Sequence, residues 1–279
     1  MDIIKNKMKV YLITCGIIAL AVTVLHTILL MNYFDGDIGY FNNSLLSSIT
    51  VAMVFVSILW FFSALLFIPK NILKADMPKT NISSKFGFIM CALLNAFGFF
   101  YYAYNLMDTQ TVSKIPLISA IFFLLSTFYF VGKAFDTFKK TDTTVLFGFF
   151  IIFTSIALLA ETYFDKFVQM NSPLKVTIQI SLLFIMLYYL SEFRFDLKKP
   201  YPRLYFVVAL SAFIICMATS IPHIIAYSSN ILDNTDYFLK DIYILINGLY
   251  IALRTVLYVK HNLSIPSVPE DIDNEIISE

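Results

Sequence analysis

Four ionisable side chains lie inside long apolar stretches of this sequence: His26, Glu161, His223 and Asp241. Each lies about four or five residues from one end of its stretch, which in a helix is roughly 5–8 Å below that end. Ionisable groups at membrane depth are energetically costly and therefore mark candidate functional sites. If the four converge, they form a polar pocket in which Glu161 supplies negative charge and a histidine responds to pH. The alternative is that each side chain reaches the lipid headgroups on its own, and the sequence leaves both interpretations open.

Other polar residues lie deeper or at the opposite ends of their stretches. Asn247 lies near the middle of the last stretch, where its amide needs a partner within the protein. It is a candidate for lining a solute pathway, and a structural hydrogen bond is the simpler explanation. Pro222 is expected to kink its helix beside His223, because proline has no N–H to donate. Glu192 and Arg254 lie at similar depths, so we expect a structural ion pair there, with an inner gate as the functional alternative.

The common signatures of catalysis and cofactor binding are missing from the sequence. It contains no GxxxxGK[ST], GxGxxG, GxSxG or HExxH motif. Its three histidines and three cysteines are widely separated, and Cys15, Cys91 and Cys216 all lie in apolar stretches, where they act as small packing residues. We therefore predict no metal and no cofactor. An intramembrane enzyme that uses Glu161 with a histidine as acid and base is a third functional alternative.

The most distinctive local sequence joins the sixth and seventh apolar stretches and runs from Tyr189 to Tyr205. It ends one stretch with Glu-x-Arg and opens the next with Lys-x-Pro-x-Pro-Arg-x-Tyr. Over these residues the chain resembles multi-pass inner-membrane proteins of Gram-positive bacteria that have no assigned activity. The resemblance implies a bacterial inner membrane and adds no chemistry.

Membrane helices must position all of these residues. Of the 279 residues, 59% are hydrophobic and 14% are charged, whereas soluble domains carry about 25% charged residues. The excess of apolar side chains has to face lipid, since a soluble surface is largely polar. Eight stretches approach the roughly 20 apolar residues that a span needs, so we expect an all-α bundle of eight transmembrane helices. They cover residues 10–32, 45–68, 86–107, 115–137, 144–165, 174–194, 204–227 and 237–259.

The distribution of Lys and Arg predicts the orientation of this bundle. Sixteen of the 20 fall at one end of the eight spans and four at the other, and the bias has the same sign in alternate loops. Cytoplasmic loops carry the excess of positive charge. We therefore predict a multi-pass protein of the cell membrane with both termini in the cytoplasm.

The connections are too short for a soluble domain, so residues 1–260 are expected to form one transmembrane domain. Residues 261–279 are acidic, lack apolar periodicity and are expected to be a disordered cytoplasmic tail. The net charge of +1 gives no reason to expect nucleic acid as a partner. The leading functional prediction is binding or transport of a small solute in an outward-facing polar pocket. A membrane scaffold whose basic cytoplasmic face or acidic tail contacts a protein partner is the alternative.

Overall fold

The computed structural model is a bundle of helices, eight of which are long and apolar enough to cross a membrane. The structure describes residues 2–35, 39–68, 73, 76–78, 80–108, 114–135, 141–166, 168–169 and 171–263. Nearly all of the predicted acidic tail therefore lies outside the described residues. The prediction of an all-α membrane bundle with eight spans is confirmed.

The elements follow one another along the chain with short connections. A two-residue antiparallel hairpin, β1 and β2, joins the first two helices. The elements are α1 (Asp2–Tyr33), β1 (Phe34–Asp35), β2 (Tyr40–Phe41), α2 (Ser44–Phe62), α3 (Ala64–Phe67), α4 (Ile82–Asp108), α5 (Lys114–Ala134), α6 (Thr141–Phe164), α7 (Pro173–Asp196), α8 (Pro202–Ser228) and α9 (Thr235–Leu263).

The second predicted span is interrupted where α2 meets α3. The Ser63 hydroxyl donates to the Trp60 carbonyl at 2.5 Å and lies 2.8 Å from the Tyr11 hydroxyl of α1. A serine hydroxyl that competes for backbone carbonyls in this way can break or bend a helix. The sequence predicted neither this break nor the β1–β2 hairpin, because a serine within a mostly apolar run and a short polar connection do not by themselves indicate them.

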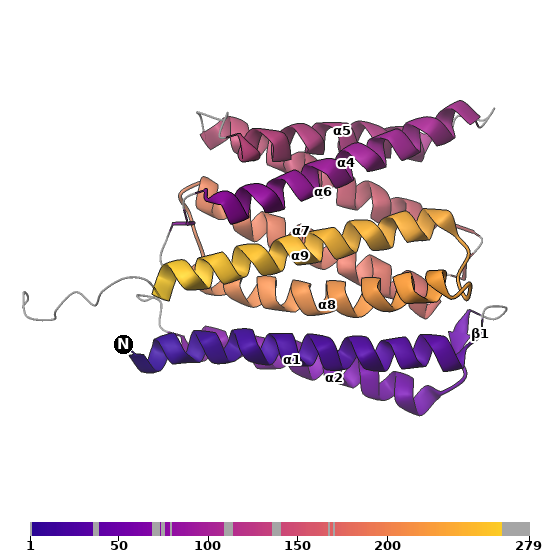
Figure 1. The fold of residues 1–279 in the computed structure, drawn as a ribbon, viewed down its shortest axis with the longest axis horizontal. Coiled ribbons are helices and arrows are strands. Elements are labelled where there is room, and N and C mark those ends of the chain that lie inside the picture. The colour runs from indigo at the N-terminus through magenta and orange to yellow at the C-terminus, as the bar shows by residue number, and fades with distance from the viewer. Residues whose placement is uncertain are drawn as a thin grey trace, which may run out of the picture.

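The long helices run alternately up and down and place their connections at two ends of the bundle (Figure 1). We call the end with β1 and β2 the hairpin end, and the end with the N-terminus of α1 the opposite end. Helix α8 lies in the middle of the bundle. It packs against α1 and α2 on one side and against α7 and α9 on the other. The described parts of α4, α5 and α6 complete the far side.

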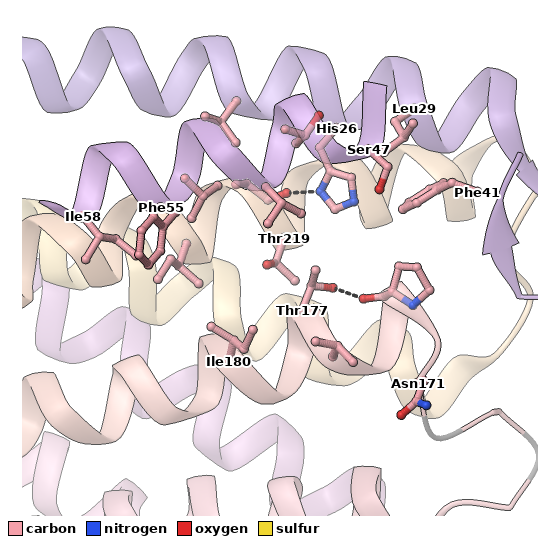
Figure 2. A pocket seen from close by; sticks show the side chains of 18 residues that line it. His26, Leu29, Phe41, Ser47, Phe55, Ile58, Asn171, Thr177, Ile180 and Thr219 are labelled. Carbon is pink, nitrogen blue, oxygen red and sulfur yellow. Dashed lines mark hydrogen bonds between the residues drawn. The ribbon is translucent and has the colours of Figure 1, made fainter. Parts of the chain in front are cut away.

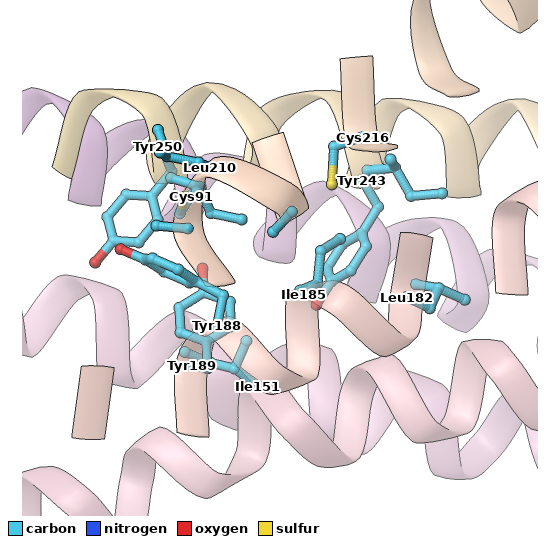
Figure 3. Close-up of a cluster of buried hydrophobic side chains, with 14 of the residues drawn as sticks. Cys91, Ile151, Leu182, Ile185, Tyr188, Tyr189, Leu210, Cys216, Tyr243 and Tyr250 are labelled. Atoms are coloured by element: carbon cyan, nitrogen blue, oxygen red, sulfur yellow. The ribbon is translucent and has the colours of Figure 1, made fainter. Parts of the chain in front are cut away.

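Helix α8 forms the centre of the bundle and α2 its lipid-facing margin. In the most apolar part of the α8 span, 78% of the residues are buried inside the protein. In the most apolar part of the α2–α3 span, only 22% of the residues are buried. Helix α9 approaches α8 closely at Gly248, where an added Cβ would lie 2.8 Å from the Cys216 Cβ. Buried tyrosines from α7 and α9, including Tyr188, Tyr189 and Tyr250, fill the interior toward the opposite end (Figure 3).

Candidate functional site

A cavity of about 480 Å³ lies between α2 and α7, with α1 and α8 behind it (Figure 2). Its size falls within the roughly 300–1,000 Å³ of small-molecule sites. On α2 its lining extends from Ser47 to Ile58, about 16 Å of helix. The lining residues are Val22, His26, Leu29, Phe41, Ser47, Thr50, Val51, Val54, Phe55, Ile58, Asn171, Pro173, Val176, Thr177, Ile180, Ile215, Ala218 and Thr219.

The cavity wall is mostly apolar and its rim faces the surrounding lipid. Val51 and Phe55 on the α2 side expose 66% and 62% of their surface, and Ile180 on the α7 side is also exposed. All three are aliphatic or aromatic and occur within membrane spans. The hydroxyl groups of Thr50 and Thr177 donate to carbonyls of their own helices, so they can offer the cavity acceptor lone pairs but no free O–H donor. The cavity therefore opens on the apolar, exposed surface of the membrane spans.

His26 is the ionisable residue in the lining, and Pro222 explains its position. An α-helical N–H donates to the carbonyl four residues earlier, but Pro222 has none, so the Ala218 carbonyl lacks its helical donor. The His26 Nδ1 atom lies 2.5 Å from that oxygen. A carbonyl only accepts hydrogen bonds, so Nδ1 carries the proton. The neutral imidazole then has its lone pair on Nε2, for which the described residues supply no hydrogen-bond partner, and the ring lies at the cavity wall (Figure 2).

Behind His26, the side chains of His223 on α8 and Asp241 on α9 form a buried pair. The His223 Nδ1 atom lies 2.9 Å from Asp241 Oδ1, and both side chains are completely buried. The His26 and His223 rings meet edge to face, with centroids 5.6 Å apart. The sequence placed these three residues at one depth, and the structure brings them together in one contiguous group.

Three atoms around this buried pair have no hydrogen-bond partner among the described residues: His223 Nε2, Asp241 Oδ2 and the Tyr227 hydroxyl. Tyr227 lies one helical turn after His223 on α8. Leaving a buried polar atom unpaired costs about 1–3 kcal/mol. Polar residues that are retained at such a cost inside a membrane protein commonly have a functional role.

Glu161 and Asn247, which the sequence also predicted as solute-binding residues, bond elsewhere. The Tyr102 hydroxyl of α4 donates to Glu161 Oε2 at 2.5 Å. Asn247 accepts from the Tyr189 hydroxyl at 2.7 Å and donates to the Tyr243 carbonyl at 2.8 Å. Neither residue lines the described cavity. The bonds of Glu161 with Tyr102 and of Asn247 with Tyr189 join helices to one another, as structural hydrogen bonds in membranes do.

Glu192 and Arg254 form the ion pair that we expected between α7 and α9. The Arg254 Nε atom donates to Glu192 Oε1 at 2.8 Å, and both side chains are buried. The Tyr250 hydroxyl lies 3.2 Å from each carboxylate oxygen, so it donates to the same group. Several aromatic rings enclose the pair, including Phe88, whose centroid is 5.5 Å from the guanidinium carbon. These aromatic surroundings favour a structural role for the ion pair, which joins α7 to α9.

Sequence reasoning missed the cavity itself and the part that the hairpin plays in it. Phe41 of β2 lies in the lining, with its ring centroid 6.1 Å from that of His26. The Ser172 hydroxyl donates to the Gly39 carbonyl, which ties the hairpin connection to the residue preceding α7. The hairpin thus closes one end of the cavity. Apart from its Ser and Thr residues, helix α2 is apolar on all sides, so its sequence has no clear periodicity that could have indicated a cavity-lining face.

Comparison with known proteins does not identify a family for this chain. No protein-family model, curated protein or solved structure matches the chain. Among the described residues, no group of three or more His, Cys, Asp or Glu side chains could hold a metal ion. The function must therefore be argued from the cavity and the three ionisable residues beside it.

Proposed function

We propose that this multi-pass membrane protein binds a small, mostly apolar solute in the cavity between α2 and α7, through one hydrogen bond to His26. The observation that carries this proposal is the position of the imidazole, a single ionisable group in the apolar wall of a cavity that opens toward lipid. Ligand sites commonly combine an apolar lining with a few placed polar groups. The sequence predicted a polar pocket, and the apolar lining changes the class of solute that fits best.

The tautomer of His26 specifies the polar end of this solute. Since Nδ1–H is engaged by the Ala218 carbonyl, a neutral imidazole offers only the Nε2 lone pair to the cavity. That atom accepts a hydrogen bond, so a solute with a hydroxyl or another neutral donor is complementary to it. A pure hydrocarbon would leave Nε2 without a partner.

The distribution of basic residues supports placing this cavity in the outer leaflet. If both termini are cytoplasmic, the hairpin end faces outward, and Phe41 and Asn171 in the lining mark that end of the cavity. The solute would then enter from the outer half of the bilayer of a cell membrane. Movement of the bound solute across the membrane is one use of such a site, and storage or sensing of it is another.

Quenching of a tryptophan placed at the cavity tests whether the site binds. Trp60 is the only tryptophan of the chain and does not line the cavity, so Trp60→Phe with Phe55→Trp moves the fluorophore to the rim. ω-Bromodecanol is then titrated into the protein in lipid nanodiscs. We expect saturable quenching of the rim tryptophan, whereas Trp60 in the original protein should show only the gradual quenching caused by partition into lipid. Equal, non-saturating responses at both positions would overturn the proposal.

Replacing His26 by Asn tests the hydrogen bond separately from folding. The Asn amide can still donate to the Ala218 carbonyl, but it has no atom in the place of Nε2. In the reporter protein we expect ω-bromodecanol to bind about tenfold more tightly than bromodecane, equivalent to about 1.4 kcal/mol. The His26→Asn variant should lose this preference but still bind both. A preference that survives the substitution would contradict the role of His26.

A further inference from the structure

The buried pair, His223 and Asp241, has a property that solute binding does not use. Its side chains are completely shielded from solvent, and its outer atoms, His223 Nε2 and Asp241 Oδ2, have no partner among the described residues. With Asp241 ionised and His223 neutral, the pair carries one negative charge. With an added proton on the imidazole, the same pair is neutral overall. A buried, uncompensated charge is far costlier than a neutral ion pair.

The other titratable groups near the pair offset this charge only in part. Lys240 precedes Asp241 on α9 and interacts with it electrostatically, but its ammonium lies over the Tyr237 ring, 4.7 Å from the centroid, and also interacts with Glu161. Tyr227 on α8 and His26 on α1 also lie near the pair, and His26 lies between the pair and the cavity. On α7, Lys175 is bound to the Asp165 carbonyl. The described residues of α2 contain no ionisable side chain.

We propose that the buried pair binds one exchangeable proton and that occupation of the cavity increases its proton occupancy. The inference rests on the proposed function, because it couples the same cavity to the pair. In the unprotonated state His223 Nδ1–H donates to Asp241 Oδ1 and the Nε2 lone pair is free. The incoming proton, taken from water, forms an N–H bond at Nε2 and gives an imidazolium beside the carboxylate. Release returns that proton to water.

A bound solute acts on the pair through His26. A hydroxyl that donates to His26 Nε2 keeps that imidazole neutral. With no positive charge on His26, whose ring centroid is 5.6 Å from that of His223, protonation of His223 meets less repulsion. Solute binding should therefore be accompanied by proton uptake.

Histidine ¹⁵N NMR can follow both events in one sample, since the chain contains only three histidines. His26 reports occupation of the cavity and His223 reports protonation. His261, near the other end of α9 and about 30 Å along the helix from Asp241, serves as the internal control. Single substitutions assign the signals. The labelled protein in nanodiscs is measured from about pH 5 to about pH 8, with and without 1-decanol.

We expect 1-decanol to perturb His26 and, at one or more fixed pH values in this series, to raise the protonated fraction of His223 at least twofold. His261 should not change. In the Asp241→Asn variant the dependence of His223 on decanol should disappear while the response of His26 persists. If decanol perturbs His26 but leaves the protonation of His223 unchanged at every pH, the proton proposal is overturned and solute binding stands. If His26 does not respond, the proposed function itself fails.

Discussion

The ion pair between Glu192 and Arg254 gives a prediction whose size follows from its surroundings. In Arg254→Met the side chain keeps much of its apolar length, but the Glu192 carboxylate loses the one cationic partner that the described residues give it, the Nε donor at 2.8 Å. What remains is the Tyr250 hydroxyl, 3.2 Å from each carboxylate oxygen. Removing one partner of a buried pair costs about 3–5 kcal/mol, because a buried charge is left uncompensated. We expect the free energy of unfolding to fall by that amount.

Reversible unfolding in mixed micelles, with increasing mole fraction of sodium dodecyl sulfate, measures this loss. The double variant Glu192→Gln with Arg254→Met removes both charges, so it should be more stable than Arg254→Met alone. The ion pair of Lys133 with Asp196 supplies a matched control. Its Nζ–Oδ2 distance is 3.0 Å, but the two side chains are 23% and 27% exposed. Lys133→Met should cost no more than about 1 kcal/mol. Equal costs for Lys133→Met and Arg254→Met, or a double variant no more stable than Arg254→Met alone, would refute the reasoning.

Three further predictions concern packing, topology and the volume of the cavity. Gly248→Ala should destabilise the protein by about 1–3 kcal/mol in the same unfolding assay, because its Cβ would meet α8 side chains, whereas Gly16→Ala, with nothing within 4 Å, should not. In intact cells a membrane-impermeant maleimide should label Asn230→Cys, between α8 and α9, but not Lys199→Cys, between α7 and α8; the reverse pattern would invert the orientation. Val54→Phe should weaken saturable binding of ω-bromodecanol at the rim tryptophan several-fold by filling the cavity, and unchanged binding would place the solute elsewhere.

The sequence was informative wherever depth in the membrane was the deciding quantity. Counting residues from the ends of the apolar stretches placed His26, His223 and Asp241 at one level, and the structure brings them together. The short connection between α8 and α9 makes these helices antiparallel neighbours, which allows His223 to contact Asp241. The same depth argument grouped Glu161 with them, but it bonds to Tyr102 of α4 instead. Depth alone does not specify which neighbours a helix has.

The features that sequence could not predict depend on packing between distant segments. Pro222 indicated a missing backbone hydrogen bond, but only the contact of α1 with α8 shows that His26 supplies the replacement. The cavity arises because α2 and α7 both pack on α8 while leaving space between them. The apolar residues that line this space resemble those that face lipid, so no residue pattern distinguishes the two environments.

A crystal structure of the protein grown in a lipidic mesophase with ω-bromodecanol tests the central claim most directly, because anomalous scattering locates the bromine. The account predicts a bromine peak between α2 and α7, with the solute hydroxyl within hydrogen-bonding distance of His26 Nε2. A bromine found only in the lipid around the bundle, with the wall beside His26 and Ala218 unoccupied by the alcohol, would contradict it.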